Sequence, residues 1–209
     1  MAFPSFLLAG FYDECLRAAP EIVKNATGKT IKFCVLTTYN LTMHPMKVFG
    51  ISGWSGSGKT TLIEHLLPLW RAKGLTVSLI KHTHHGFDID RPGKDSWRFR
   101  EAGASEVMLA GAQRWALMHE LREGPEPVLA DLLSHLAPCD LVIVEGFKSA
   151  GLPKIEVHRP SLGKAFFHAE FPAVVALASD VALDIALPVL DLNDPPAIAD
   201  WILDYCGLI

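Results

Sequence analysis

The chain has 209 residues, the length of one α/β domain or of one domain with an appendage. Half of its residues are hydrophobic, and the net charge of −4 with a pI near 6.1 argues against nucleic acid as the main partner. The four cysteines are widely separated and lack the spacing of a disulfide framework or a zinc site. No apolar run reaches the roughly 18 residues that cross a bilayer, so we expect a cytoplasmic protein without a membrane partner.

The first 45 residues carry no motif to which chemistry can be attached. Residues 14–24 are predicted to form a short helix and residues 31–37 a strand. We therefore expect an N-terminal extension of unknown role over residues 1–45 and a folded domain over residues 46–209. Two interpretations of the extension remain open: a genuine appendage, or a native start at Met46.

A complete phosphate-binding loop, GWSGSGKT, occupies residues 53–60. An apolar strand is predicted before it, over residues 46–52, and a helix after it, over residues 61–73; this is the context in which such loops bind phosphate. Glycines let backbone N–H groups surround phosphate oxygens, and the helix N-terminus adds its positive end. We predict a nucleoside triphosphate site in which Lys59 reaches the β- and γ-phosphates and Thr60 ligates Mg²⁺. The alternative is a glycine-rich turn with an accidental Lys-Thr pair.

A loop with three histidines and two aspartates follows the second predicted strand, residues 76–81. Because open α/β sheets bind ligands at the carboxyl ends of their strands, this loop, residues 82–90, should lie beside the phosphate loop. We interpret it as a nucleotide-sensing or substrate-contacting loop; a zinc site and a solvated polar loop are the alternatives. Asp88 and Asp90 are expected to be outer partners of Mg²⁺, because carboxylates are hard oxygen ligands.

A cationic segment, residues 91–100, then leads into a helix that should end at Gly103. Its arginines and lysine are predicted either to offset phosphate charge or to form a solvated helix face.

Two strands, residues 106–110 and 114–119, should form a hairpin, and residues 125–136 a helix with prolines at its start.

A continuous apolar run over residues 139–146 predicts a buried parallel strand that ends in an acid, Glu145. A carboxylate at this place meets the Mg²⁺ shell in Walker B elements, so Glu145 is predicted to position Mg²⁺ or water. The alternative is a strand that merely ends in glutamate. Further strands are expected over residues 154–158, 173–178 and 187–192, and a last helix over residues 195–205. This alternation predicts an α/β fold of the P-loop NTPase class: a mostly parallel sheet with helices on both faces, in three α/β/α layers.

Taken together, these motifs resemble the molybdopterin-guanine dinucleotide biosynthesis protein B family (MobB). The resemblance covers residues 46–209 and is carried by the phosphate loop, IKHTHH at residues 80–85, DIDRPGKDS at 88–96, VEGFK at 144–148, PKIEVHR at 153–159 and ALASD at 176–180. It implies a GTP-binding protein with slow, Mg²⁺-dependent hydrolysis that helps the guanylyltransferase joining GMP to molybdopterin. It also implies a homodimer whose sheets extend across the interface, with molybdopterin as a further candidate partner. The usual N/T-K-x-D guanine motif is absent from the sequence, and Asp180 is the best substitute.

The motifs and the resemblance together predict three overlapping sets of site residues. The catalytic residues are Lys59, Glu145 and Asp90, and the metal ligands are Thr60, Glu145 and Asp88. The nucleotide is expected to contact Gly53, Trp54, Ser55, Gly56, Ser57, Gly58, Lys59, Thr60, Thr61, His82 and Asp180. Two other functions remain open: a small-molecule kinase in which residues 91–100 act as a lid, and a non-enzymatic adapter in which GTP only sets shape and partner choice.

Overall fold

The structure is a computed structural model that describes residues 21–24, 30–33, 46–83 and 86–209. Contacts along the chain divide it into two units, residues 1–43 and 44–209. Among the described residues, no helix is long and apolar enough to cross a membrane.

The first unit contains a two-stranded antiparallel sheet. β1 (Glu21–Lys24) pairs with β2 (Thr30–Phe33). The helix predicted over residues 14–24 is therefore wrong at residues 21–24, and residues 14–20 lie outside the described chain. The physical reason is local, because β-branched Ile22 and Val23 favour a strand. The strand predicted over residues 31–37 is confirmed as far as Phe33, where the description ends.

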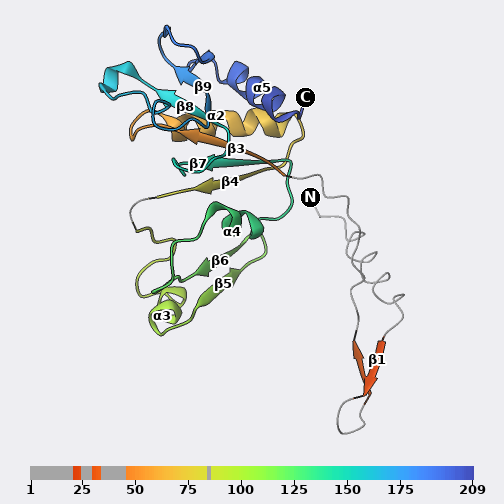
Figure 1. The fold of residues 1–209 in the computed structure, drawn as a ribbon. Helices are drawn as coiled ribbons and strands as arrows, with labels where there is room; N and C mark the ends of the chain where they lie inside the picture. Colours follow the sequence, from red (N-terminus) through yellow and green to blue (C-terminus); the bar gives the residue numbers. More distant parts are fainter. Residues whose placement is uncertain (1–20, 25–29, 34–45, 84–85) are drawn as a thin grey trace. The chain divides into compact units, whose positions relative to one another are not determined.

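A sheet of six parallel strands forms the centre of the second unit, in the order β10-β9-β8-β3-β7-β4 (Figure 1). Its strands are β3 (Lys47–Ser52), β4 (Val77–Lys81), β7 (Leu141–Glu145), β8 (Lys154–His158), β9 (Val174–Ser179) and β10 (Val189–Asp191). The predicted parallel sheet is confirmed. Because every strand runs the same way, all the carboxyl ends meet at one edge of the sheet.

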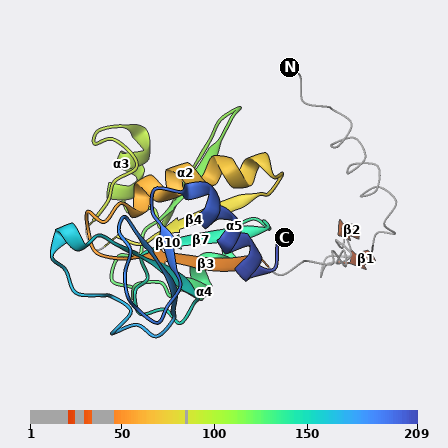
Figure 2. The ribbon, with the colours of Figure 1, turned by 90° about the horizontal axis from the view of Figure 1, so that it is seen from above.

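Helices cover both faces of this sheet, which confirms the three-layer prediction. On one face, α2 (Lys59–Ala72) lies beside α5 (Pro195–Cys206), as Figure 2 shows. Trp70 of α2 and Ile202 of α5 are fully buried there with Phe49 of β3. The burial of these side chains holds α2, and with it the phosphate loop, in place against the sheet.

The other face is covered by α4 (Leu129–Ser134). Leucines of α4 pack against Val142 and Val144 of β7 and Ile80 of β4. The helix is shorter than the predicted range, residues 125–136, and its prolines precede it. Pro127 disfavours the helical conformation in Glu126, which keeps residues 125 and 126 out of the helix, and the helix begins after the extended Val128.

Between β4 and β7 the chain leaves the sheet. It forms α3 (Asp95–Glu101) and then the antiparallel pair β5 (Glu106–Ala110) and β6 (Trp115–His119), which confirms the predicted hairpin. Val107 and Met118 face each other on one side of this ribbon and are buried. The paired residues on its other side remain exposed.

Candidate functional site

The predicted phosphate loop connects β3 to α2 at the carboxyl edge of the sheet. Its backbone requires glycine at three places, because Gly53, Gly56 and Gly58 have φ angles of 140°, 81° and 98°. A Cβ atom at Gly53 would also lie 2.4 Å from the carbonyl oxygen of Val157. Gly58 is the N-cap of α2, so the first-turn N–H groups of a 14-residue helix end at this loop. The loop therefore offers backbone donors and the positive end of a helix dipole to an anion.

Ser57 has a polar atom without a partner. Its side chain is 1% exposed, and its Oγ makes no hydrogen bond with any part of the chain that the structure describes. A buried hydroxyl left unpaired costs about 1–3 kcal/mol. A phosphate oxygen bound in the glycine-rich loop would accept a hydrogen bond from this hydroxyl and so give it a partner.

Lys59 bends back across the loop, and its Nζ donates to the carbonyl oxygen of Trp54 at 2.8 Å. Burial lowers the pKa of Lys59, and the nearby positive charges of Lys148 and Lys81 lower it further, while Glu145 opposes the shift. Three ammonium groups therefore share the space around the loop with one carboxylate.

Thr60, Lys81 and Glu145 meet where α2 begins and β4 and β7 end. Thr60 Oγ1 donates to Glu145 Oε1 at 3.2 Å, and Lys81 Nζ lies 3.1 Å from both carboxylate oxygens. Glu145 is only 6% exposed, and Lys81 stands opposite it in the β4–β7 register. The structure thus brings two predicted site residues, Thr60 and Glu145, into direct contact. A hydroxyl and a carboxylate are hard oxygen ligands of the kind that Mg²⁺ prefers.

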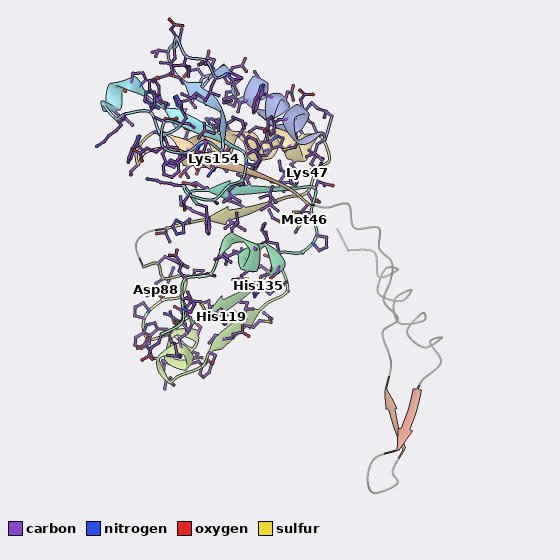
Figure 3. The ribbon with its side chains drawn as sticks, in the orientation of Figure 1. Met46, Lys47, Asp88, His119, His135 and Lys154 are labelled. Carbon is purple, nitrogen blue, oxygen red and sulfur yellow. The ribbon has the colours of Figure 1, made fainter. Side chains whose placement is uncertain are left out.

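Asp88 and Asp90 belong to a separate cluster around Arg100. Arg100 Nη2 donates to Asp88 Oδ1 at 2.7 Å and to Asp90 Oδ1 at 2.8 Å, and Nη1 donates to Glu120 Oε1 at 3.0 Å. The hydrogen bond to Glu120 raises the pKa of Arg100 above its usual range. Figure 3 shows Asp88 near α3, apart from Lys154 in the sheet. Both aspartates are therefore paired with Arg100, which is one of the cations in the segment 91–100 that the kinase alternative treats as a lid. The Mg²⁺ and catalytic roles of Asp88 and Asp90 stay predictions.

His82 continues β4 beside Glu145, whose carbonyl oxygen accepts its backbone N–H at 2.8 Å. Its Nε2 lies 2.6 Å from Glu126 Oε1, and the centroid of its ring lies 4.7 Å from the centroid of the Phe147 ring. The other two histidines of this loop lie outside the described residues. Within the described ranges, no three His, Cys, Asp or Glu side chains are grouped as a metal site would group them.

Arg159 is a site residue that the sequence analysis did not identify. Its Nε donates to the carbonyl oxygen of Ser57 at 3.0 Å, and its Nη1 donates to Asp180 Oδ2 at 2.6 Å. Asp180, the predicted guanine reader, is thereby connected to the phosphate loop through an arginine. The position of Arg159 directly after β8, a strand next to β3, is the signal that could have found it.

A cavity of about 280 Å³ opens beside these residues. It is lined by Gly58, Thr61, Leu62 and His65 from the loop and α2, by Arg159, and by Leu192, Asn193 and Pro195 after β10. The cavity therefore adjoins the phosphate loop at the carboxyl edge, where this class of sheet binds its ligands.

Residues 48–180 match the family model described as "Molybdopterin guanine dinucleotide synthesis protein B", MobB. The chain belongs to the MobB family. Its relatives include the "Molybdopterin-guanine dinucleotide biosynthesis adapter protein" of Haemophilus influenzae, 46% identical over 161 residues that cover 76% of this chain and 88% of the relative. The protein of the same name from Escherichia coli is 42% identical over 167 residues, covering 78% and 94% of the two chains.

Solved MobB structures have the same fold. The Bacillus subtilis MobB structure superposes with a TM-score of 0.60 at 27% identity, covering 76% of this chain and 97% of that one. A MobB homolog from Bacillus stearothermophilus gives a TM-score of 0.59 at 25% identity, covering 78% and 100%. The family match begins within β3 and ends at Asp180, so it includes the phosphate loop, Glu145 and Arg159.

Proposed function

We propose that this MobB-family chain binds GTP and Mg²⁺ at the loop between β3 and α2, hydrolyses GTP slowly, and acts as an adapter of the guanylyltransferase that joins GMP to molybdopterin. The observation that carries the proposal is the 3.2 Å contact between Thr60 Oγ1 and Glu145 at the start of α2. The adapter role is supported by the printed names of the relatives from H. influenzae and E. coli.

The residues present fit a triphosphate and its cation. Gly53 and Gly58 keep the loop open to phosphate oxygens, and Ser57 Oγ is buried there without a partner among the described residues. Lys59 supplies the flexible charge that this motif directs to the β- and γ-phosphates. Thr60 and Glu145 would hold Mg²⁺, which neutralises charge on those phosphates when bound.

The cavity beside Gly58 and Thr61 is proposed to take the nucleoside part of GTP. Guanine presents N–H donors at N1 and N2, for which a carboxylate is the matching acceptor. Asp180 does not line the cavity itself, but it is the carboxylate paired with Arg159, which does, and this ion pair fixes it relative to Ser57. Asp180 and Arg159 therefore form the proposed guanine-reading pair.

Slow turnover is expected from the groups around the loop. Glu145 is the buried acid that would orient the attacking water. Among the described residues, the cations that contact this acid or the loop carbonyls are Lys59, Lys81 and Arg159, and each is already engaged in a hydrogen bond. A partner that brings a further cation would accelerate hydrolysis, as an arginine finger does. The kinase alternative gains no support, because Arg100 of the proposed lid is held by three carboxylates.

A homodimer through the outer face of the β5–β6 ribbon is also proposed. On this face Met108 stands opposite Leu117, and Ala110 stands opposite Trp115. Met108 is 60% exposed and Trp115 is 66% exposed. An apolar face of this kind on a regular ribbon is a surface that a second copy can cover.

The site assignment is tested by titrating GTP, GDP and ATP, each with Mg²⁺, into the wild type and Lys59→Ala. Loss of a charge-assisted contact should weaken GTP binding about ten-fold or more, since such contacts contribute about 1.5–3 kcal/mol. The control is Lys73→Ala, which removes an exposed lysine paired with Asp200 at the other end of α2. GTP affinity in a folded Lys59→Ala protein equal to that of the control would refute the assignment.

The adapter role needs a second measurement, of GTP turnover with and without the guanylyltransferase. GTP-dependent binding to that enzyme with unchanged turnover identifies a nucleotide-switched adapter. Faster turnover in the complex identifies a GTPase whose site the partner completes. Absence of binding in every nucleotide state would contradict the adapter proposal.

A further inference from the structure

We infer that Lys148 is a further phosphate-binding residue, which reaches the triphosphate from the turn after β7 rather than from the phosphate loop itself. The inference rests on the proposed nucleotide site and adds a residue that the loop motif does not contain. Three independent observations support it: where the ammonium lies, which charges surround it, and how its turn is held.

The ammonium of Lys148 lies over the phosphate loop. Its Nζ is 4.7 Å from the centroid of the Trp54 ring and 5.7 Å from that of Phe167. Trp54 is the second residue of the loop motif, and its Nε1 donates to the carbonyl oxygen of Ala165 at 2.8 Å, which fixes the ring. A cation on an indole face is held more weakly than one bonded to phosphate oxygens. Lys148 therefore rests where it can move onto a phosphate bound in the loop.

The charges around Lys148 favour an anion. Among the described residues, no carboxylate forms an ion pair with Lys148. Its charge instead acts on Lys59, whose pKa is lowered first by burial and then by Lys148 and Lys81. Three ammonium groups opposed by the single carboxylate of Glu145 repel one another, and a polyanion bound between them would remove that repulsion.

The turn that carries Lys148 is held in one conformation. Lys154 is fully buried, and its Nζ donates to the carbonyl oxygens of Phe147, Lys148 and Ala150 at 3.1, 2.9 and 2.7 Å. Phe147 has a φ of 44°, a left-handed conformation that a bulky residue keeps only where its surroundings impose it. Such strained residues cluster at ligand clamps. The buried lysine thus fixes the backbone from which Lys148 extends to Trp54.

The test compares Lys148→Met, which keeps the length but removes the charge, with Lys148→Arg, which keeps the charge. Calorimetry would measure the affinities for GTP, GDP, ATP and inorganic triphosphate, with Lys73→Met as the control for loss of a lysine on an exposed surface. Lys148→Met should weaken GTP and inorganic triphosphate binding by a similar factor, about ten-fold. Lys148→Arg should recover most of that loss. A similar factor for both ligands is expected because the contact is with phosphate and not with the base.

The outcomes separate this inference from the proposed function. If the wild type binds GTP and inorganic triphosphate, and Lys148→Met binds each with the wild-type affinity, the inference is overturned while the nucleotide site stands. If the wild type binds inorganic triphosphate but does not prefer GTP to ATP, the guanine proposal fails, and a loss in Lys148→Met still supports the inference. If the wild type binds none of these anions, both the proposed function and the inference are wrong.

Discussion

The carboxyl edge of the sheet and the segment between β4 and β7 differ in which side chains they bury: the edge buries charged groups, and the segment exposes apolar ones. At the edge, charged groups are buried and paired: Glu145 is 6% exposed and contacts Thr60 and Lys81. Lys154, which begins β8 next to this edge, is fully buried and donates to three carbonyl oxygens. In the outlying segment, residues 87–128, large apolar side chains are in the open, with Phe87 72% exposed and Trp115 66% exposed. A buried polar group requires a specific partner, whereas an exposed apolar group gains from any surface that covers it.

The difference indicates what each region is built to bind. The edge holds its own charges at fixed distances, as a site for a small, charged ligand does. In the outlying segment, Arg100 forms ion pairs with Asp88, Asp90 and Glu120, which belong to the same segment. The apolar surface of this segment remains exposed and could contact another protein. Changes at the edge should therefore alter stability and ligand affinity, while changes on the outer ribbon face should alter association alone.

The largest effect is expected at the edge, from Lys154→Met. The substitution leaves three carbonyl oxygens without their donor, and each unpaired buried acceptor costs about 1–3 kcal/mol. Relief from burying a charge offsets part of this, so we expect unfolding to become easier by about 2–4 kcal/mol. Urea denaturation would measure it, with Lys47→Met as the control because Lys47 is exposed on the neighbouring strand β3. Equal midpoints for the two variants would show that Lys154 does not hold the turn.

The outlying segment should respond differently to Trp115→Asp. A charge on the outer ribbon face, opposite Ala110, would be buried in the proposed dimer and should weaken association by about 2 kcal/mol or more. Sedimentation equilibrium would measure the dimer dissociation constant, and GTP affinity should not change. Val181→Asp, at an exposed apolar residue outside this segment, is the control. A monomeric wild type, or an unaltered dimer in Trp115→Asp, would contradict the proposed interface.

The sequence predicts the strands of the central sheet better than some of the elements outside it. Strands β3 and β7 were predictable because parallel strands buried on both faces are continuous apolar runs, whereas β8 alternates buried polar and apolar residues. The contact between Thr60 and Glu145 was predictable as well, because parallel strands end at the same edge of the sheet and both residues follow or end such a strand. The strand β1 and the late start of α4 were not predicted, because the expected helices included the β-branched pair Ile22 and Val23 and counted the prolines before α4 as a first turn.

Several site contacts could not be predicted for a different reason. The reach of Lys148 to Trp54 depends on a turn in which Phe147 adopts a positive φ, and no periodicity records that conformation. The pairing of Arg159 with Asp180 depends on side-chain directions at the ends of two neighbouring strands. Residue type and spacing identify an edge and its candidates, whereas the pairs formed there depend on the turns that follow each strand.

Within the edge, Glu145→Gln should separate hydrolysis from binding. The amide keeps the shape but removes the charge that meets Thr60 and Lys81. We expect the rate of Mg²⁺-dependent GTP hydrolysis to fall about ten-fold, with a smaller change in GTP affinity. Glu64→Gln, at an exposed position of α2, is the control. Hydrolysis at the wild-type rate with the same Mg²⁺ dependence would leave Glu145 as a strand end, and the acid would have to be sought at Asp88 or Asp90.

The smallest effect is expected from Asp180→Ala, which tests whether the edge reads the base as well as the phosphates. Removing the carboxylate should lower the ratio of GTP to ATP affinity by a few-fold, the size of one hydrogen bond at about 1 kcal/mol. Arg159 also loses its partner at 2.6 Å, but its contact with Ser57 remains available. Inorganic triphosphate, which has no base, is therefore the internal control, and its affinity should stay constant. An unchanged GTP-to-ATP ratio would remove Asp180 from base reading. A fall in triphosphate affinity instead would show that Asp180 acts through Arg159 on the phosphate loop.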